Sequence, residues 1–272
     1  MQFTSVLSFL NYSFMQNALF TIILIAPIFA LLGVIVLNNR LVFFSDCIGH
    51  SGLAGVAIGI LLGLSPTFAM LILAILIAIV VTLLKYRTKS SQDTVLGVIL
   101  ASITALGIVL LSNGGNFSKF TSYLIGDILA ITLTQIIYLV IIGILFIIYS
   151  IFFTNSLVLI SIDPLLAKSK HISVYLSEIS FTIVLAIIIV LTLKFIGILV
   201  ISSLLILPPA TAKILANNFR QSIIFAIAIS LVAGILGLML SYYLGTATGA
   251  TIVIVNSIFY LLAIIIKNLR FQ

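Results

Sequence analysis

Residues 40–64 read RLVFFSDCIGHSGLAGVAIGILLGL, an apolar stretch that carries one carboxylate and one imidazole. Its length and apolar content predict a helix that spans a lipid bilayer. Asp46 and His50 are four residues apart, so they lie on one face of this helix, one turn from each other. Ionisable side chains inside a bilayer are costly, and they usually face a cavity or another subunit. We therefore expect this pair to carry function.

The depth of the pair follows from Arg40, whose charge should stay near a lipid headgroup. His50 lies about 15 Å further along a helix, which is close to the middle of a bilayer core of about 30 Å. The same stretch contains glycines at helical spacing, which let a second backbone come close. They predict tight packing against another helix: Gly52, Gly55, Gly59 and Gly63.

A plainer interpretation is that Asp46 and His50 bond each other and only fix helices together, as in a membrane scaffold. The chain has only five acidic residues and two histidines, and that scarcity favours a transport role. Cys47 can serve as a soft metal ligand or as a small apolar residue in helix packing. It is the only cysteine, which excludes an internal disulfide.

The composition excludes a soluble globular domain. Of 272 residues, 63% are hydrophobic and 6% are charged, which predicts an all-α, polytopic transmembrane bundle forming a single domain over residues 1–272. The net charge of +7 could suggest a nucleic-acid partner in a soluble protein. Here the basic residues cluster in short loops, the pattern that orients membrane proteins. We therefore expect membrane lipid and no nucleic acid as the surroundings of the chain.

Eight or nine spans are expected. Pro208 and Pro209 fall within one of them, residues 195–216, where they predict a broken helix or a re-entrant segment. With nine crossings the N-terminus lies outside and the C-terminus inside, and only Lys119 and Lys194 of the twelve basic residues lie outside. The segment from Tyr123 leads into the fifth span, which is expected to reach about residue 153. The other expected spans are 18–37, 40–64, 67–84, 93–111, 174–193, 195–216, 222–241 and 250–266.

Three further acidic residues have expected places. Asp93 and Glu178 are predicted at the membrane edge, and Asp93 suits the positive end of a helix. Asp127 either caps or bonds a helix end near the outer face, or takes part in metal entry.

No motif for ATP binding or hydrolysis is present. The chain lacks the Gly-x-x-x-x-Gly-Lys-Ser/Thr phosphate loop, and it also lacks His-Glu-x-x-His and Gly-x-Ser-x-Gly segments. It is therefore not expected to be an enzyme. Energy for transport must come from an ion gradient or from another subunit.

The segment SDCIGHSGLAGVAIGILLGLSP resembles the signature of the permease subunits of ABC importers for zinc and manganese. LAGVAIGILL and LILPPATAK are closer to the zinc-uptake branch. Four further segments agree in order: QDTVLGVILASITALG, SYLIGDILAIT, IGILVISSLLILPPATAKILA and GLMLSYYLGTATGATIVIVNSIFYLLA.

The resemblance implies a multi-pass permease of the bacterial plasma (inner) membrane that serves high-affinity zinc uptake. It implies a dimer of permeases, two cytoplasmic ATP-binding subunits and an extracytoplasmic metal-binding protein. Zn²⁺ would be the transported substrate, with no permanently bound cofactor. The alternatives are a manganese or iron ABC permease, or a gradient-driven metal transporter without an ATPase.

The resemblance also assigns roles to residues. Asp46 and His50 match the positions that contact the metal in transit. The coupling element that transmits closure of the ATPase would lie around Asp163, Pro164, Ala167 and Lys168. This chain departs from its relatives there, because they often have an acidic residue in place of Leu165 and a glycine in place of His171. We expect His171 to be a solvated loop residue.

Overall fold

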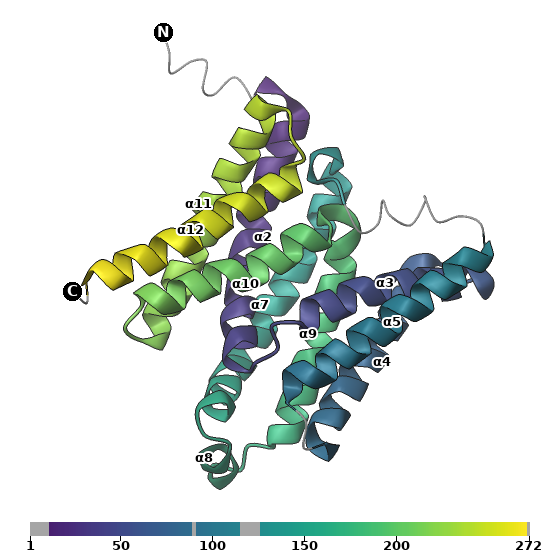
Figure 1. Ribbon diagram of the computed structural model, residues 1–272, viewed down its shortest axis with the longest axis vertical. Helices are drawn as coiled ribbons and strands as arrows, with labels where there is room; N and C mark the ends of the chain where they lie inside the picture. Colours follow the sequence, from purple (N-terminus) through teal and green to yellow (C-terminus); the bar gives the residue numbers. More distant parts are fainter. Residues whose placement is uncertain (1–10, 89–90, 115–125, 271–272) are drawn as a thin grey trace. The chain divides into compact units, whose positions relative to one another are not determined.

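The chain folds into helices throughout the part that the structure describes. A computed structural model describes residues 11–88, 91–114 and 126–270, and every regular element within them is helical (Figure 1). Nine of these helices are long and apolar enough to cross a membrane. This confirms the all-α class and the higher of the two expected span counts. Lys89, Lys119 and most of residues 112–122, which follow the fourth expected span, lie outside the described residues.

The long helices are joined by short connections. A 3-10 turn, η2 (Ile128–Ala130), precedes α7, and a short helix, α8 (Pro164–Ser169), joins α7 to α9. The nine long helices are α2 (Ser13–Asn38), α3 (Phe44–Leu61), α4 (Pro66–Arg87), α5 (Gln92–Gly114), α7 (Leu133–Ile162), α9 (Val174–Ile196), α10 (Ile198–Leu215), α11 (Phe219–Leu244) and α12 (Thr248–Arg270).

The helices form two compact units. The first unit contains most of α2, the first half of α7, η2 and α10 to α12. The second unit contains α3, α4, α5, α8, α9 and the second half of α7. Because α7 runs through both, each unit is built from segments that are far apart in the sequence.

Helix α3 is the inner helix of the second unit. Of the residues in Phe44–Leu61, 72% are buried, whereas only 17% are buried in Asp93–Leu110 of α5. A Cβ at Gly55 would lie 2.7 Å from Cα of Met70, and one at Gly59 would lie 2.9 Å from Cβ of Ala69. Only glycine allows α3 and α4 to approach this closely. The predicted tight packing is confirmed for these two positions, while Gly63 ends the run outside the helix with φ 68°.

The first unit also contains a close helix crossing. Gly33 of α2 lies against the backbone carbonyl of Leu205 in α10, where a Cβ would overlap that oxygen. The carbonyl of Leu205 is the one that residue 209 would bond in a regular helix, and Pro209 has no N–H to donate. The glycine therefore packs onto a turn that the proline has left open.

The prediction that Pro208 and Pro209 break the helix is wrong. Both lie inside α10, which runs without interruption from Ile198 to Leu215. Proline has a φ angle that suits a helix, so two missing hydrogen bonds open the turn without ending it. The break in this region occurs at Gly197, whose φ of 83° favours glycine and separates α9 from α10.

The predicted end of the fifth span is also wrong. The segment from Tyr123 was expected to lead into a span that reaches about Phe153, whereas α7 covers Leu133–Ile162. Its start is set by reciprocal bonds: the N–H of Thr132 donates to Oε1 of Gln135 at 2.9 Å, and the N–H of Gln135 donates to Oγ1 of Thr132 at 3.4 Å. This is a capping box. The apolar residues after Asn155 extend the helix into what looked like a loop.

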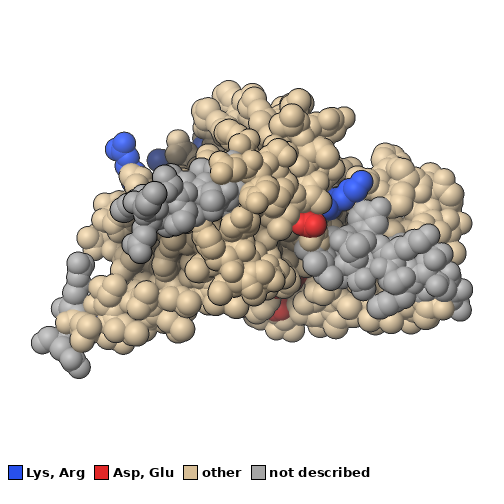
Figure 2. Space-filling model, turned by 90° about the horizontal axis from the view of Figure 1, so that it is seen from above, with Lys and Arg blue, Asp and Glu red and all other residues tan. Residues whose placement is uncertain are grey.

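The surface has few charged side chains. On the face shown in Figure 2, only a few Lys, Arg, Asp and Glu residues stand among uncharged side chains. Many large apolar side chains are exposed, and Ile151 and Phe152 of α7 are more than two-thirds exposed. Such a surface suits lipid as the surrounding solvent.

Candidate functional site

Asp46 and His50 both lie on α3, on its first and second turns. Their four-residue spacing places them on one face, as predicted, and both side chains are half-buried. The helix begins at Phe44 and not at Arg40, because residues 40–43 form a turn. His50 therefore lies about 9 Å from the start of the helix at the usual rise per residue. Asp46 in the first turn is close to the positive end of the helix dipole.

His50 has a buried nitrogen atom without a hydrogen-bond partner. Its Nδ1 is inaccessible to solvent, and no donor or acceptor within the described residues reaches it. Buried polar atoms in native proteins nearly always have a partner, so an unpaired one calls for an explanation. An imidazole nitrogen is also a common ligand of transition metals. The atom is available for a ligand that the chain alone does not supply.

One copy of the chain supplies too few ligands to enclose a metal ion. Within the described residues, no group of three His, Cys, Asp and Glu side chains is placed to hold one. Cys47, the residue after Asp46 on α3, is fully buried. Its packing favours the second of its two interpretations, a small apolar residue of the helix interior. Asp46 and His50 remain as a pair.

A second polar cluster joins α4 to α9 within the same unit. Nζ of Lys85 lies 2.7 Å from Oε2 of Glu178, and the hydroxyl of Tyr86 donates to the same oxygen at 3.0 Å. One turn away, Oγ1 of Thr82 and Oγ1 of Thr182 are 3.0 Å apart. Glu178 was predicted only as a membrane-edge residue. Its partners lie more than 90 residues away in the sequence, so no local pattern could identify them.

Two hollows in the described residues are poor candidates for a transport site. A cavity of about 10 Å³ borders the Lys85–Glu178 pair, which is room for about one water molecule. A groove of about 570 Å³ between α2 and α7 is lined by apolar side chains such as Pro27 and Ile144. Neither offers a set of metal ligands.

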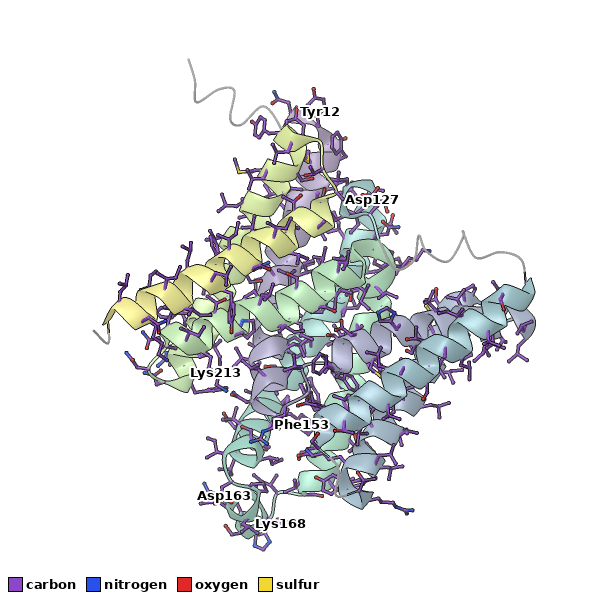
Figure 3. All side chains as sticks on the ribbon, in the orientation of Figure 1. Tyr12, Asp127, Phe153, Asp163, Lys168 and Lys213 are labelled. Carbon is purple, nitrogen blue, oxygen red and sulfur yellow. The ribbon has the colours of Figure 1, made fainter. Side chains whose placement is uncertain are left out.

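Helix α8 contains the residues expected to form the coupling element. Asp163 caps it, with Oδ1 accepting from the N–H groups of Leu165 at 2.8 Å and Leu166 at 3.2 Å. Ala167 is fully buried in a small cluster with Ile160 and Val174. Figure 3 shows Asp163 and Lys168 at this short helix, which joins the end of α7 to the start of α9.

The exposed side of α8 is apolar at its tip and basic at its end. Ile162 and Leu165 are each 75% exposed, and Leu166 is 45% exposed. Lys168, Lys170 and His171 follow them and are also exposed. His171 therefore lies in solvent contact, as expected. Asp127 caps η2 through the N–H of Leu129 at 3.0 Å, which confirms the first of its two interpretations.

Comparison with known proteins gives a consistent family. Residues 11–267 match the model of the ABC 3 transport family. The zinc uptake membrane protein ZnuB of Haemophilus influenzae is 37% identical over 91% of this chain and 95% of its own length. The manganese import permease ScaB of Streptococcus gordonii is 29% identical over 94% of this chain and 92% of its own length.

A solved structure agrees with these matches. PsaBC from Streptococcus pneumoniae, solved in complex with a Fab, superposes with a TM-score of 0.80 and 28% identity, covering 96% of this chain and 94% of that one. The family match and the similarity to ZnuB both extend over nearly the whole sequence and include α3 with Asp46 and His50. A helical membrane protein with these relatives is a permease, and the chain belongs to the ABC 3 transport family.

Proposed function

We propose that this protein is the membrane-spanning subunit of an ATP-driven importer that carries divalent transition metals, with zinc as its principal substrate. The chain acts as a single transmembrane domain in the bacterial inner membrane. ATP is hydrolysed by separate cytoplasmic subunits, since the sequence has no phosphate loop. An extracytoplasmic binding protein delivers the metal to the outer side.

The observation that carries this proposal is the unpaired Nδ1 of His50, one helical turn from Asp46 on an inner helix of the second unit. Imidazole nitrogen and carboxylate oxygen both bind zinc at about 2.0–2.2 Å, and zinc prefers four such ligands in a tetrahedron. One chain offers two. A site that is half complete in each copy binds its ion for transit and can release it again.

The choice of metal rests on ligand chemistry and on relatives. A site with nitrogen and oxygen donors takes zinc, manganese or iron, and affinity generally rises toward zinc. The similarity to ZnuB, at 37% identity, is higher than that to ScaB, at 29%. Both facts favour zinc, and manganese or iron is the alternative substrate.

We further propose that α8 docks onto the ATP-binding subunit. The exposed Ile162, Leu165 and Leu166 form an apolar tip that would fill a groove on that subunit, with Lys168 at its rim. Asp163 fixes the start of α8, and the buried Ala167 anchors it to α7 and α9. Movement of the docked subunit would then reach the membrane helices.

The test of the metal site uses Asp46→Asn and His50→Gln. Each variant keeps the approximate size of the side chain and replaces a zinc ligand with an amide that binds zinc more weakly. Cys47→Ala is the matched control, because it alters the neighbouring buried side chain and leaves the proposed ligand pair, Asp46 and His50, unchanged. With the ATP-binding subunit present, both site variants should lose zinc uptake and growth under chelation at normal abundance. Unchanged uptake in both would refute the site. Reduced abundance with unchanged selectivity would support the scaffold interpretation instead.

A second experiment separates ATP-driven from gradient-driven transport. Purified protein in lipid vesicles should move no zinc down a gradient unless the ATP-binding subunit and ATP are supplied. Uptake by the permease alone would favour the gradient-driven alternative. Competition among zinc, manganese and iron in the complete system identifies the substrate.

A further inference from the structure

The groove between α2 and α7 lies wholly within the first unit. Its lining runs from Phe20 to Ile28 on α2 and from Leu133 to Ile147 on α7, and we call it the α2–α7 groove. Every side chain that lines it is apolar. Its rims are open, since Phe20 is 62% exposed and Ile144 is 53% exposed. The groove therefore faces the surroundings of the helices.

Two contacts fix the spacing of α2 and α7. Just before α7 begins, Nδ2 of Asn17 donates to the carbonyl oxygen of Ile131 at 3.2 Å. Further along both helices, a Cβ at Gly143 would lie 2.7 Å from Cδ1 of Ile28, so glycine lets the helices meet there. Because the two helices are held at both levels, the groove is preformed, as ligand sites usually are.

The length and depth of the groove match one leaflet of a bilayer. At about 1.5 Å per residue, its walls extend about 12 Å along α2 and about 21 Å along α7. One leaflet contributes about 15 Å to a hydrocarbon core of about 30 Å. Both helices are long and apolar enough to cross a membrane. The α2–α7 groove therefore lies at the depth of lipid acyl chains.

The lining identifies the occupant. Water in a cavity needs about two to four polar partners, and these side chains offer none. An empty groove of about 570 Å³ would forfeit the dispersion contacts of its walls. A closely packed helix favours small residues at the contact, whereas Phe20, Ile144 and Ile147 at the rims are large. A narrow, flexible hydrocarbon chain satisfies all three conditions.

We propose that one acyl chain of a phospholipid lies in the α2–α7 groove and stays bound to the protein. The polar side chains beside the end of the groove near the start of α7 are uncharged: Asn17, Thr132 and Gln135. Recognition therefore rests on the chain and not on the charge of the headgroup. The proposal does not depend on which metal is transported.

The first test compares Ile144→Trp with Leu145→Trp. These neighbours on α7 are both more than half exposed, but only Ile144 lines the groove. Native mass spectrometry of the full chain in mild detergent should find one phospholipid per chain in the wild type and in Leu145→Trp. Retention by Ile144→Trp should fall about tenfold, because the indole takes the space of the acyl chain. Equal retention by the two variants, or none by the wild type, would overturn the proposal.

The second test maps the bound chain on the wild-type protein, so it does not depend on how a variant folds. Phospholipids with a diazirine in one acyl chain are reconstituted with the protein, and bulk lipid is removed before irradiation. Adducts should concentrate on residues 20–28 and 133–147 with either phosphatidylglycerol or phosphatidylethanolamine. Adducts spread over all exposed helices, or found with only one headgroup, would overturn the proposal.

The third test asks whether a protein helix fills the groove instead. Benzoylphenylalanine in place of Val140, which lines the groove, is irradiated in native membranes. The expected product is the chain with the added mass of one phospholipid. An adduct with another protein or with a second copy of the chain would overturn the proposal.

Discussion

Nζ of Lys85 lies 2.7 Å from Oε2 of Glu178, and this ion pair joins the last turn of α4 to the first half of α9. The side chains are 30% and 12% exposed, so water screens the pair only in part. The hydroxyl of Tyr86 donates to the same carboxylate oxygen. Since α9 is the next helix after α8, the pair fixes the helix that follows the proposed coupling element.

Glu178→Gln should lower stability, because it leaves the Lys85 ammonium half-buried without its counter-charge. We expect the free energy of unfolding to fall by about 1–2 kcal/mol. This is less than the roughly 3–5 kcal/mol that is lost when one partner of a fully buried ion pair is removed. Thermal unfolding in detergent measures it. Lys194→Gln at the exposed end of α9 is the control and should stay within about 0.5 kcal/mol. Equal effects of the two variants would show that the pair adds nothing.

Gly55→Ala should destabilise the second unit strongly. The new Cβ would lie 2.7 Å from Cα of Met70, so α3 and α4 must separate. Gly97→Ala makes the same chemical change on α5 where nothing lies within 4 Å, and it should be neutral or stabilise by up to about 1 kcal/mol. Thermal unfolding of both variants tests the difference. A similar melting temperature would contradict the close packing.

Asn256→Leu should be neutral or slightly stabilising. Nδ2 of Asn256 donates to Oγ of Ser203 at 3.3 Å and to the carbonyl of Ile252 at 3.1 Å, but its buried Oδ1 has no partner in the described residues. An unsatisfied buried acceptor costs about 1–3 kcal/mol, and an apolar side chain of similar size removes that cost. Asn256→Asp should destabilise instead. A clear drop in melting temperature for Asn256→Leu would show that Oδ1 is bonded.

Asp163→Ala should loosen α8 without unfolding the rest of the protein. The carboxylate accepts from two N–H groups at the start of α8, and losing such a cap costs about 1 kcal/mol. Hydrogen exchange of residues 165–169 should accelerate several-fold, and ATP-driven transport should fall. Asp163→Asn keeps the cap and should preserve protection. Unchanged exchange in Asp163→Ala would contradict this role.

The helix content and the Asp46–His50 face could be predicted because both follow from local spacing. Apolar stretches of membrane length and a four-residue interval need no knowledge of the rest of the chain. Gly55 and Gly59 likewise indicated close packing, and the structure supplies α4 as the neighbour.

The errors arose where two local rules competed or where contacts are distant in sequence. Pro208 and Pro209 satisfy the φ of a helix while removing two donors, and the first effect prevailed. The capping box of Thr132 and Gln135 was a readable signal for the start of α7. No local sequence signal indicated the Lys85–Glu178 pair, because its members meet only through the packing of α4 on α9.

The contact between Gly33 and the Leu205 carbonyl means that substitutions at residues 33 and 209 should depend on each other. A side chain at residue 33 has no room beside the Leu205 carbonyl and the Pro209 ring, and Pro209 has no N–H to bond that carbonyl. A variant that replaces Gly33 should survive only when α10 changes as well. Relatives of this chain should therefore vary at residues 33 and 209 together, and a screen for suppressors of Gly33→Ala should return substitutions around Leu205.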